Sequence, residues 1–216
     1  MSDYFPVEQE YGYSVFSTVF HVEWNNKQLN IIDCPGADDF VGAAMTALNV
    51  TDTALLLING QYGPEVGTQN HFRYTEKLGK PVIFLVNQLD SEKCDYHQVL
   101  DSLIGIYGPK VIPIQYPLNE GPDFNSLIDV LLMKKYSWKP EGGAPIIEDI
   151  PAEEMDKAME MAQMMLKNAP IAISLAKQSI NEGYDLKQVF RFRFLLESYC
   201  QIGKHKTLGT LISQGF

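Results

Sequence analysis

The sequence predicts an α/β fold, in which helices flank a mostly parallel sheet and a small all-helical segment follows at the C-terminal end. Two almost wholly apolar runs of strand length, residues 53–60 and 81–90, are typical of parallel strands buried on both faces. Stretches with apolar residues at helical spacing alternate with these runs, which implies right-handed crossovers. Beyond residue 154, the apolar residues follow helical spacing alone.

Two strands joined by a turn are expected near the start of the sequence. Residues 13–24 alternate bulky and smaller or polar side chains, and Asn25 and Asn26 then favour a turn. The next run rises into a strand that ends at Asp33, before a Pro-Gly pair. Because ligand sites of open α/β sheets gather at the carboxyl ends of strands, Asp33 is a candidate site residue.

The central elements follow in alternation. Helices are predicted over residues 40–49, 68–78 and 94–107, and Gly79 is a stop signal for the second of them. Residues 110–138 then predict a strand, a turn rich in Pro and Gly, and a further apolar stretch.

A change of composition suggests two domains, residues 1–154 and 155–216. Residues 139–154 are rich in Gly, Pro and acidic side chains, which is typical of a boundary. Beyond it, two helical bursts are separated near Pro170, and Gly183 is the stop signal of the second.

Composition and charge exclude several classes of protein. Hydrophobic residues make up 45% and charged residues 20% of the 216-residue chain, which argues against disorder. A net charge of −10 argues against direct nucleic-acid binding, and no apolar run is long enough to span a membrane. The three cysteines and four histidines show no spacing typical of a metal site. We therefore expect a cytoplasmic protein with reduced thiols.

Two short motifs and their surroundings resemble the GTP-binding domain of translation elongation factor G. Residues 33–36 match its DxxG element, and residues 87–90 resemble its NKxD element. Residues 8–15 resemble its switch segment, and residues 112–138 contain sequence similar to the insert of that factor. The likeness covers residues 2–154 and implies a P-loop GTPase-type sheet that binds GTP or GDP with Mg²⁺. It also implies the ribosome as a partner of the full-length factor.

The chemistry of these motifs can be stated residue by residue. Asp33 could hold Mg²⁺ through water, and Gly36 would let its backbone N–H approach a terminal phosphate. Asp90 could accept two hydrogen bonds, from the N1 and N2 donors of guanine, while Asn87 would brace the loop. A carboxylate that meets the wrong base leaves polar groups unpaired, so this contact would select guanine.

Several departures from the family pattern predict a truncated and inactive domain. The sequence contains no GxxxxGK[ST] motif, whose backbone N–H groups and Lys hold the phosphates. Ala37 stands where the family has the His that positions the attacking water, and Gln88 stands for the Lys of NKxD. Tyr11 replaces the switch Arg, whereas Ser14 replaces the switch Thr and keeps a hydroxyl as a weak Mg²⁺ ligand. Without its early strand the sheet would expose an edge, which the C-terminal helices or a homo-oligomer would cover.

The C-terminal segment carries a second resemblance. Residues 155–185 are similar to the C-terminal helices of the crotonase family, the enoyl-CoA hydratases and their relatives. The carboxylates and oxyanion hole that crotonase catalysis implies would come from earlier in that fold, and no such region precedes the segment. A chimera, a coincidence of helical spacing, and a non-catalytic structural or interaction module therefore remain as alternatives.

Overall fold

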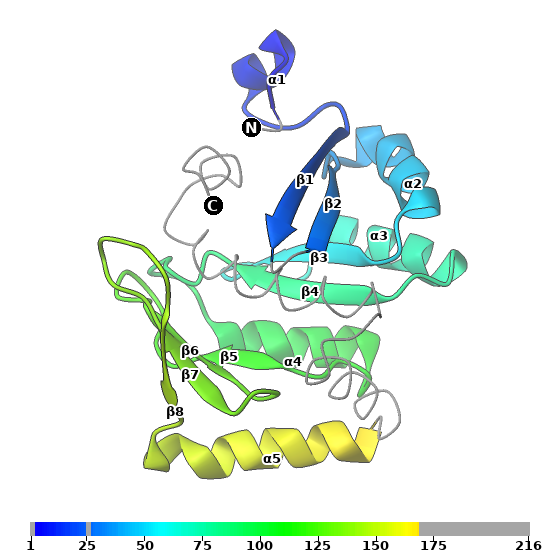
Figure 1. Ribbon diagram of the computed structural model, residues 1–216. Coiled ribbons are helices and arrows are strands. Elements are labelled where there is room, and N and C mark those ends of the chain that lie inside the picture. Colours follow the sequence, from blue (N-terminus) through cyan, green and yellow to red (C-terminus); the bar gives the residue numbers. More distant parts are fainter. Residues whose placement is uncertain (1–2, 25–26, 169–216) are drawn as a thin grey trace. The chain divides into compact units, whose positions relative to one another are not determined.

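The computed structural model describes residues 3–24 and 27–168 (Figure 1). The expected turn at Asn25 and Asn26, and the second C-terminal helix with its stop at Gly183, lie outside these residues. The described elements, in chain order, are α1 Pro6–Tyr11, β1 Thr18–Trp24, β2 Lys27–Asp33, η1 Asp38–Phe40, α2 Val41–Val50, β3 Ala54–Asn59, α3 Val66–Lys77, β4 Val82–Asn87, α4 Tyr96–Tyr107, β5 Gln115–Pro117, β6 Ser126–Asp129, β7 Lys134–Ser137, β8 Ile146–Asp149 and α5 Ala152–Asn168.

The chain divides into two compact units. In the described part, unit 1 contains residues 3–24, 27–58 and 64–85, and unit 2 contains residues 59–63 and 86–168. Both β3 and β4 begin in unit 1 and end in unit 2. Each unit is described by itself below.

The strand pair of unit 1 is an antiparallel hairpin. β1 and β2 pair in a register that sets Thr18 opposite Asp33. The predicted strand began at residue 13, but β1 starts at Thr18. The backbone N–H groups of Val15 and Phe16 instead donate to the Glu8 carboxylate, each at 3.0 Å. Because these donors are already used, residues 13–17 do not extend the ladder.

β3 and β4 form the parallel pair that the sequence predicts. Ala54 N–H donates to the Pro81 carbonyl at 3.0 Å, and Gly60 N–H donates to the Asn87 carbonyl at 2.8 Å. The N-terminal ends of the two strands are therefore bonded to each other, and so are their C-terminal ends, which is the arrangement of a parallel pair. Within unit 1, α3 packs against β4 through Phe72 and Phe84, whose ring centroids are 5.8 Å apart. The α/β fold class is confirmed.

Unit 2 is built around a four-stranded antiparallel sheet, which the sequence indicated only in part. Its strand order is β5-β6-β7-β8. Side chains of β5 and β6 share one buried cluster with α4 and α5, and the cluster is Tyr96, Tyr116, Ile128, Val130, Ile150, Ala158, Met161 and Met165. The burial of these apolar side chains stabilises unit 2.

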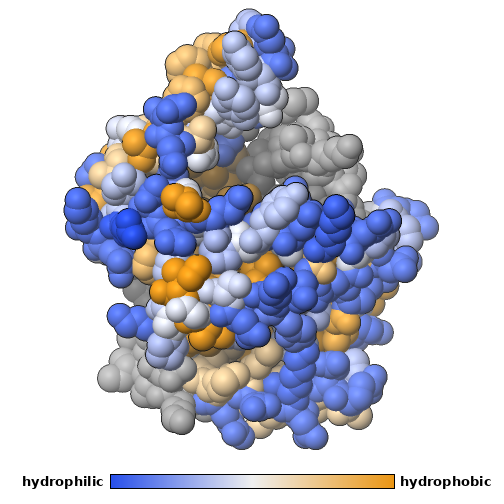
Figure 2. Space-filling model, turned by 180° about the vertical axis from the view of Figure 1, so that it is seen from behind, coloured by the Kyte–Doolittle hydropathy of each residue, from blue (hydrophilic) through white to orange (hydrophobic). Residues whose placement is uncertain are grey.

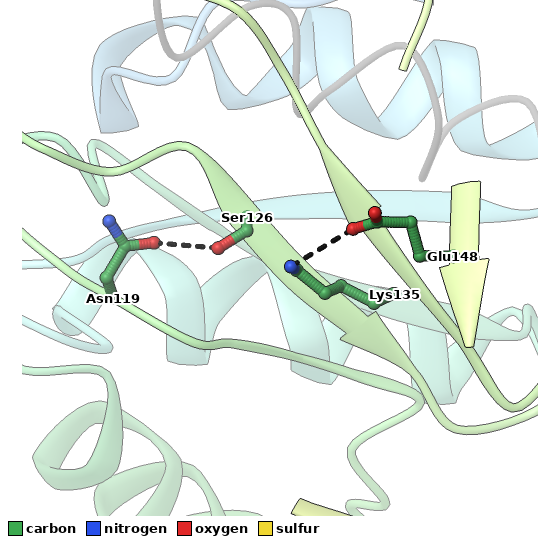
Figure 3. A network of polar contacts seen from close by, with 4 residues as sticks. All are labelled: Asn119, Ser126, Lys135 and Glu148. Atoms are coloured by element: carbon green, nitrogen blue, oxygen red, sulfur yellow. Dashed lines mark hydrogen bonds and ion pairs between the residues drawn. The ribbon is translucent and has the colours of Figure 1, made fainter. Parts of the chain in front are cut away.

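The boundary expected between residues 154 and 155 falls inside α5. The Gly- and Pro-rich stretch before it is a hairpin turn, in which Gly142 N–H donates to the Lys139 carbonyl at 3.0 Å. The turn returns the chain to the sheet as β8, where Lys135 Nζ lies 3.2 Å from Glu148 Oε2 (Figure 3). Composition therefore marks a tight turn here, because Gly142 and Gly143 both adopt positive φ.

Hydrophilic side chains cover much of the face shown in Figure 2, and they separate the apolar residues into small groups. None of the helices in residues 3–24 and 27–168 is long and apolar enough to cross a membrane.

Candidate functional site

The two motifs lie in different units, the DxxG residues in unit 1 and the NQLD residues in unit 2. In unit 1, Asp33 is the last residue of β2 and is half-buried. The side chain of Pro35 is fully buried, which anchors the turn that follows the strand. The hydroxyl of Ser17 contacts the Cys34 sulfur at 3.6 Å, and burial raises the pKa of the Cys34 thiol.

Gly36 is exposed, and nothing around it requires a glycine. A Cβ at this position would meet no atom within 4 Å, and the residue does not adopt positive φ. Ala37 is also exposed and precedes the short helix η1. Its methyl group can neither donate nor accept a hydrogen bond. The backbone at Gly36 is thus open to a ligand, whereas Ala37 offers no proton-transfer group.

The switch-like segment is held by a buried carboxylate that sequence analysis did not single out. Glu8 is 1% exposed and accepts hydrogen bonds from the backbone N–H groups of Phe5, Val15 and Phe16. Ser14, which directly precedes Val15, donates its hydroxyl to Asp3 Oδ1 at 2.7 Å. The Ser14 oxygen keeps its lone pairs while it donates to Asp3, so this hydrogen bond fixes the direction of the hydroxyl without using its capacity as a metal ligand.

In unit 2, residues 87–90 form a tight turn at the end of β4. Asn87 Oδ1 accepts the N–H of Gln88 at 2.8 Å, and the Gln88 carbonyl accepts the N–H of Ser91 at 3.1 Å. Gln88 has φ of 61°, a left-handed conformation that is uncommon for residues other than glycine. The turn is therefore held at both of its ends.

Asp90 lies within this turn, between Gln88 and Ser91, and is half-buried. Within residues 3–24 and 27–168, no side chain or backbone group donates a hydrogen bond to its carboxylate. Both oxygens can therefore accept from a ligand with two adjacent donors.

The loop at residues 118–126 supports this turn, although no motif marked it. Gly121 N–H donates to the Leu89 carbonyl at 2.8 Å, and Glu120 Oε2 accepts the N–H of Tyr96 at 2.9 Å. Ser126 in turn donates its hydroxyl to Asn119 Oδ1 at 3.1 Å (Figure 3). These contacts join sequence-distant segments, so no local pattern could have revealed them.

The end of β3 supplies two further residues that sequence analysis missed. Asn59 Nδ2 donates to Gln88 Oε1 at 2.8 Å. Gly60 lies so close to β4 that a Cβ would come within 2.8 Å of the Asn87 carbonyl oxygen and 2.9 Å of Cys94 Sγ. The available signal was the Asn-Gly pair at the exit of an apolar strand, which is the same position that singled out Asp33.

Cys94, whose backbone N–H donates to the Ser91 carbonyl at 3.0 Å, is not a reactive thiol. Burial, and next the charge of Glu120, raise its pKa to about 12, so the sulfur stays protonated at neutral pH. Across the described residues, no group of three or more His, Cys, Asp or Glu side chains could hold a metal ion.

Comparison with known proteins identifies relatives of this arrangement. The family described as "Elongation factor Tu GTP binding domain" matches residues 1–190. Elongation factor G of Rhodopseudomonas palustris is 35% identical over 169 residues, which are 77% of this chain and 24% of the relative. An elongation factor G-like protein of Thermotoga maritima is 28% identical over 183 residues, or 85% of this chain and 26% of the relative.

A solved structure shares the fold. A crystal structure of a Thermus thermophilus protein matches with a TM-score of 0.71 at 29% identity, over 85% of this chain and 27% of the other. The chain thus spans about a quarter of the length of the curated relatives it matches. The family match to residue 190 also runs across the segment that resembles crotonases.

Proposed function

This chain belongs to the elongation factor Tu GTP binding domain family, and from that membership we propose that it recognises the base of GDP or GTP through the loop Asn87–Asp90. Relatives of the elongation factor G type support a role in translation, with the ribosome as the partner of the full-length factor and the cytoplasm as its location.

The observation that carries this proposal is the available carboxylate of Asp90 beside a firmly held turn. A carboxylate pairs with two adjacent N–H donors, as guanine presents at N1 and N2. Adenine offers a different pattern, so it would leave polar groups unpaired at a cost of about 1–3 kcal/mol each. Because the turn is held at Asn87 and Ser91, the carboxylate needs little reordering before it binds.

The residues that would bind the phosphates match the family pattern less well than those that would bind the base. These 216 residues contain no GxxxxGK[ST] motif, and Ala37 lacks the chemistry of the family His. Asp33 fits a water-mediated role toward Mg²⁺, and the hydroxyl of Ser14, which donates to Asp3, would supply at most one weak ligand through its oxygen. Mg²⁺ would neutralise phosphate charge when bound. We propose that this chain alone binds the base more strongly than the phosphates and does not hydrolyse GTP.

Titration of labelled GDP in the presence of Mg²⁺ tests the base-binding proposal. We expect saturation, and a midpoint below about 10 μM, near −7 kcal/mol, would be strong support. No binding at millimolar nucleotide would overturn the proposal and favour the inert structural or interaction module.

A base-specific variant sharpens the test. Asp90→Asn should shift preference from guanine toward xanthine, because the carboxylate that accepts from N1 and N2 becomes an amide. Asp101→Asn, on the exposed surface of α4, is the matched control and should leave base preference unchanged. Unaltered preference in Asp90→Asn would show that Asp90 does not contact the base.

The same samples separate the remaining alternatives. Three interpretations stay as proposals: a chimeric origin of residues 155–185, a truncated domain with its boundary at residue 154, and the weaker hypothesis of an enoyl-CoA hydratase fragment. A hydratase fragment would turn over or bind an enoyl-CoA thioester, whereas the proposed function requires binding of GDP only. Sedimentation of the same samples measures whether the chain forms a homo-oligomer.

A further inference from the structure

The contact between Asn59 and Gln88 joins two segments that lie 29 residues apart in the sequence. It lies within unit 2, where β3 ends beside the turn after β4. Gln88 is exposed, so a side chain of this kind would ordinarily sample several rotamers in water. A single hydrogen bond at 2.8 Å holds it instead.

The direction of this hydrogen bond is fixed by the surroundings of Asn59. Its Oδ1 accepts the backbone N–H groups of Gln61 at 2.8 Å and Tyr62 at 3.3 Å. An amide nitrogen in that place would face two donors and could accept neither. Nδ2 therefore points to Gln88 and donates, and the Gln88 oxygen must accept.

Asn59 is itself firmly anchored. Besides the two hydrogen bonds to its side chain, its carbonyl accepts the N–H of Gly63 at 2.8 Å. Gln88 is held in turn at its N–H by Asn87, at its carbonyl by Ser91 and at its side chain by Asn59. Such support explains how a residue other than glycine persists at φ of 61°.

We propose that Asn59 is a positioning residue of the base-recognition loop, which fixes Gln88 and thereby sets the direction of the Asp90 carboxylate two residues later. This inference rests on the proposed function, because it concerns how the same loop selects guanine. Asn59 does not need to touch the nucleotide. Its effect should therefore appear in base discrimination as well as in loop rigidity.

Because Asn59 donates and Gln88 accepts, substitutions at the two positions should affect GDP binding differently. Asn59→Asp should bind GDP nearly as well as the wild type, because the Gln88 amide can rotate and donate from its nitrogen. Gln88→Lys alone should weaken binding, since its ammonium would face the Asn59 amide nitrogen, and donor would meet donor. Asn59→Asp combined with Gln88→Lys should restore binding, because a carboxylate then faces an ammonium.

The experiment measures the dissociation constants of GDP and IDP for these variants and for Asn59→Ala, Gln88→Ala and their double variant. IDP lacks the N2 donor, so the ratio of the two constants reports on Asp90. We expect each single alanine variant to reduce the preference for GDP about 5-fold, and the double variant to be no worse than either. Gln98→Ala, exposed on α4, is the control and should leave the ratio unchanged.

Amide hydrogen exchange supplies a readout without nucleotide. Asn59→Ala should speed exchange at Gln88 and Ser91 while exchange at Leu103, in the buried part of α4, stays slow. Additive effects on the GDP/IDP ratio, or no rescue in the Asp-Lys pair, would overturn the inference while wild-type GDP binding still stands. Wild-type protein that fails to bind millimolar GDP would overturn the proposed function and this inference with it.

Discussion

At the scale of single residues, two glycines beside the motifs have opposite reasons to lack a side chain. Gly60 is required by packing, because the Asn87 carbonyl oxygen and Cys94 Sγ occupy the place of a Cβ. Gly36 has open space and an ordinary backbone conformation. The proposed approach of a phosphate group to the Gly36 backbone would give this glycine a role that the fold itself does not require.

The two glycines should therefore respond differently to the same substitution. We expect Gly60→Ala to destabilise the protein by about 1–3 kcal/mol, because the new methyl group forces β4 or Cys94 to move. Gly36→Ala is the control and should leave the urea midpoint within error. Equal midpoints for the two variants would show that the ends of β3 and β4 can separate without cost.

Glu8 gives the N-terminal segment a defined pH dependence. Hydrogen bonds from the backbone N–H groups of Phe16 and Val15 hold the pKa of Glu8 below its ordinary value of 4.5, although burial opposes them. A carboxylate with a lowered folded pKa contributes stability that is fully present above 4.5 and is lost as pH falls through the lowered value.

We expect Glu8→Gln to remove this part of the acid dependence and to speed exchange of the Val15 and Phe16 amides at neutral pH. Glu10→Gln, exposed on the same helix, is the matched control and should change neither. Hydrogen exchange followed by NMR from pH 7 to pH 3 measures both effects. Unchanged protection of Val15 in Glu8→Gln would show that the segment is held by other contacts.

At the scale of elements, apolar patterning predicted α2, α3, α4 and the two parallel strands closely, whereas the short helix α1 was not predicted. The predicted strand start at residue 13 was wrong, since a distant carboxylate uses the N–H groups of Val15 and Phe16. The Pro- and Gly-rich stretch of residues 139–154 was interpreted as a boundary, which stays a prediction, and the structure places the β7–β8 turn within this stretch. Composition alone cannot tell a linker from a tight turn, because both need Gly and Pro.

The candidate site shows the same limit. Asp33, Gly36, Asn87 and Asp90 could be singled out because they stand in short motifs at strand exits that resemble those of elongation factor G. Glu120 and Gly121 could not, because their roles depend on which distant segment lies against them, and Asn59 had only the Asn-Gly pair at a strand exit as its signal. Tertiary hydrogen bonds of this kind leave no periodic signal in the sequence.

The packing of α5 predicts a sharp contrast between two adjacent methionines. Met165 is 2% exposed within the core cluster of unit 2, whereas Met164 is 44% exposed. We expect Met165→Ala to destabilise the protein by about 2–5 kcal/mol, and Met164→Ala to have little effect. Urea unfolding of the two variants measures the difference. Similar midpoints would mean that α5 is not part of this core, and would favour the expected boundary at residue 154.

At the scale of the whole molecule, the net charge and the share of the relatives' length that the chain covers limit the functions it can have. A net charge of −10 disfavours broad contact with RNA phosphates, so contacts with a ribosome would depend on a few placed side chains or on other parts of a longer factor. The matched relatives are about four times as long as the aligned region. Base recognition is local to one loop, whereas hydrolysis requires groups from several segments at once.

Hydrolysis is therefore the property we expect these 216 residues to lack. GTP turnover needs phosphate donors, a metal ion and a group that positions water, and the loss of several charge-assisted hydrogen bonds weakens phosphate binding by orders of magnitude. We predict that phosphate release from GTP with Mg²⁺ equals that in buffer. Ala37→His should not raise it, since an imidazole without a held γ-phosphate has no water to orient. Magnesium-dependent phosphate release above buffer, abolished by Asp33→Ala, would contradict this prediction and require a phosphate cradle elsewhere in the chain.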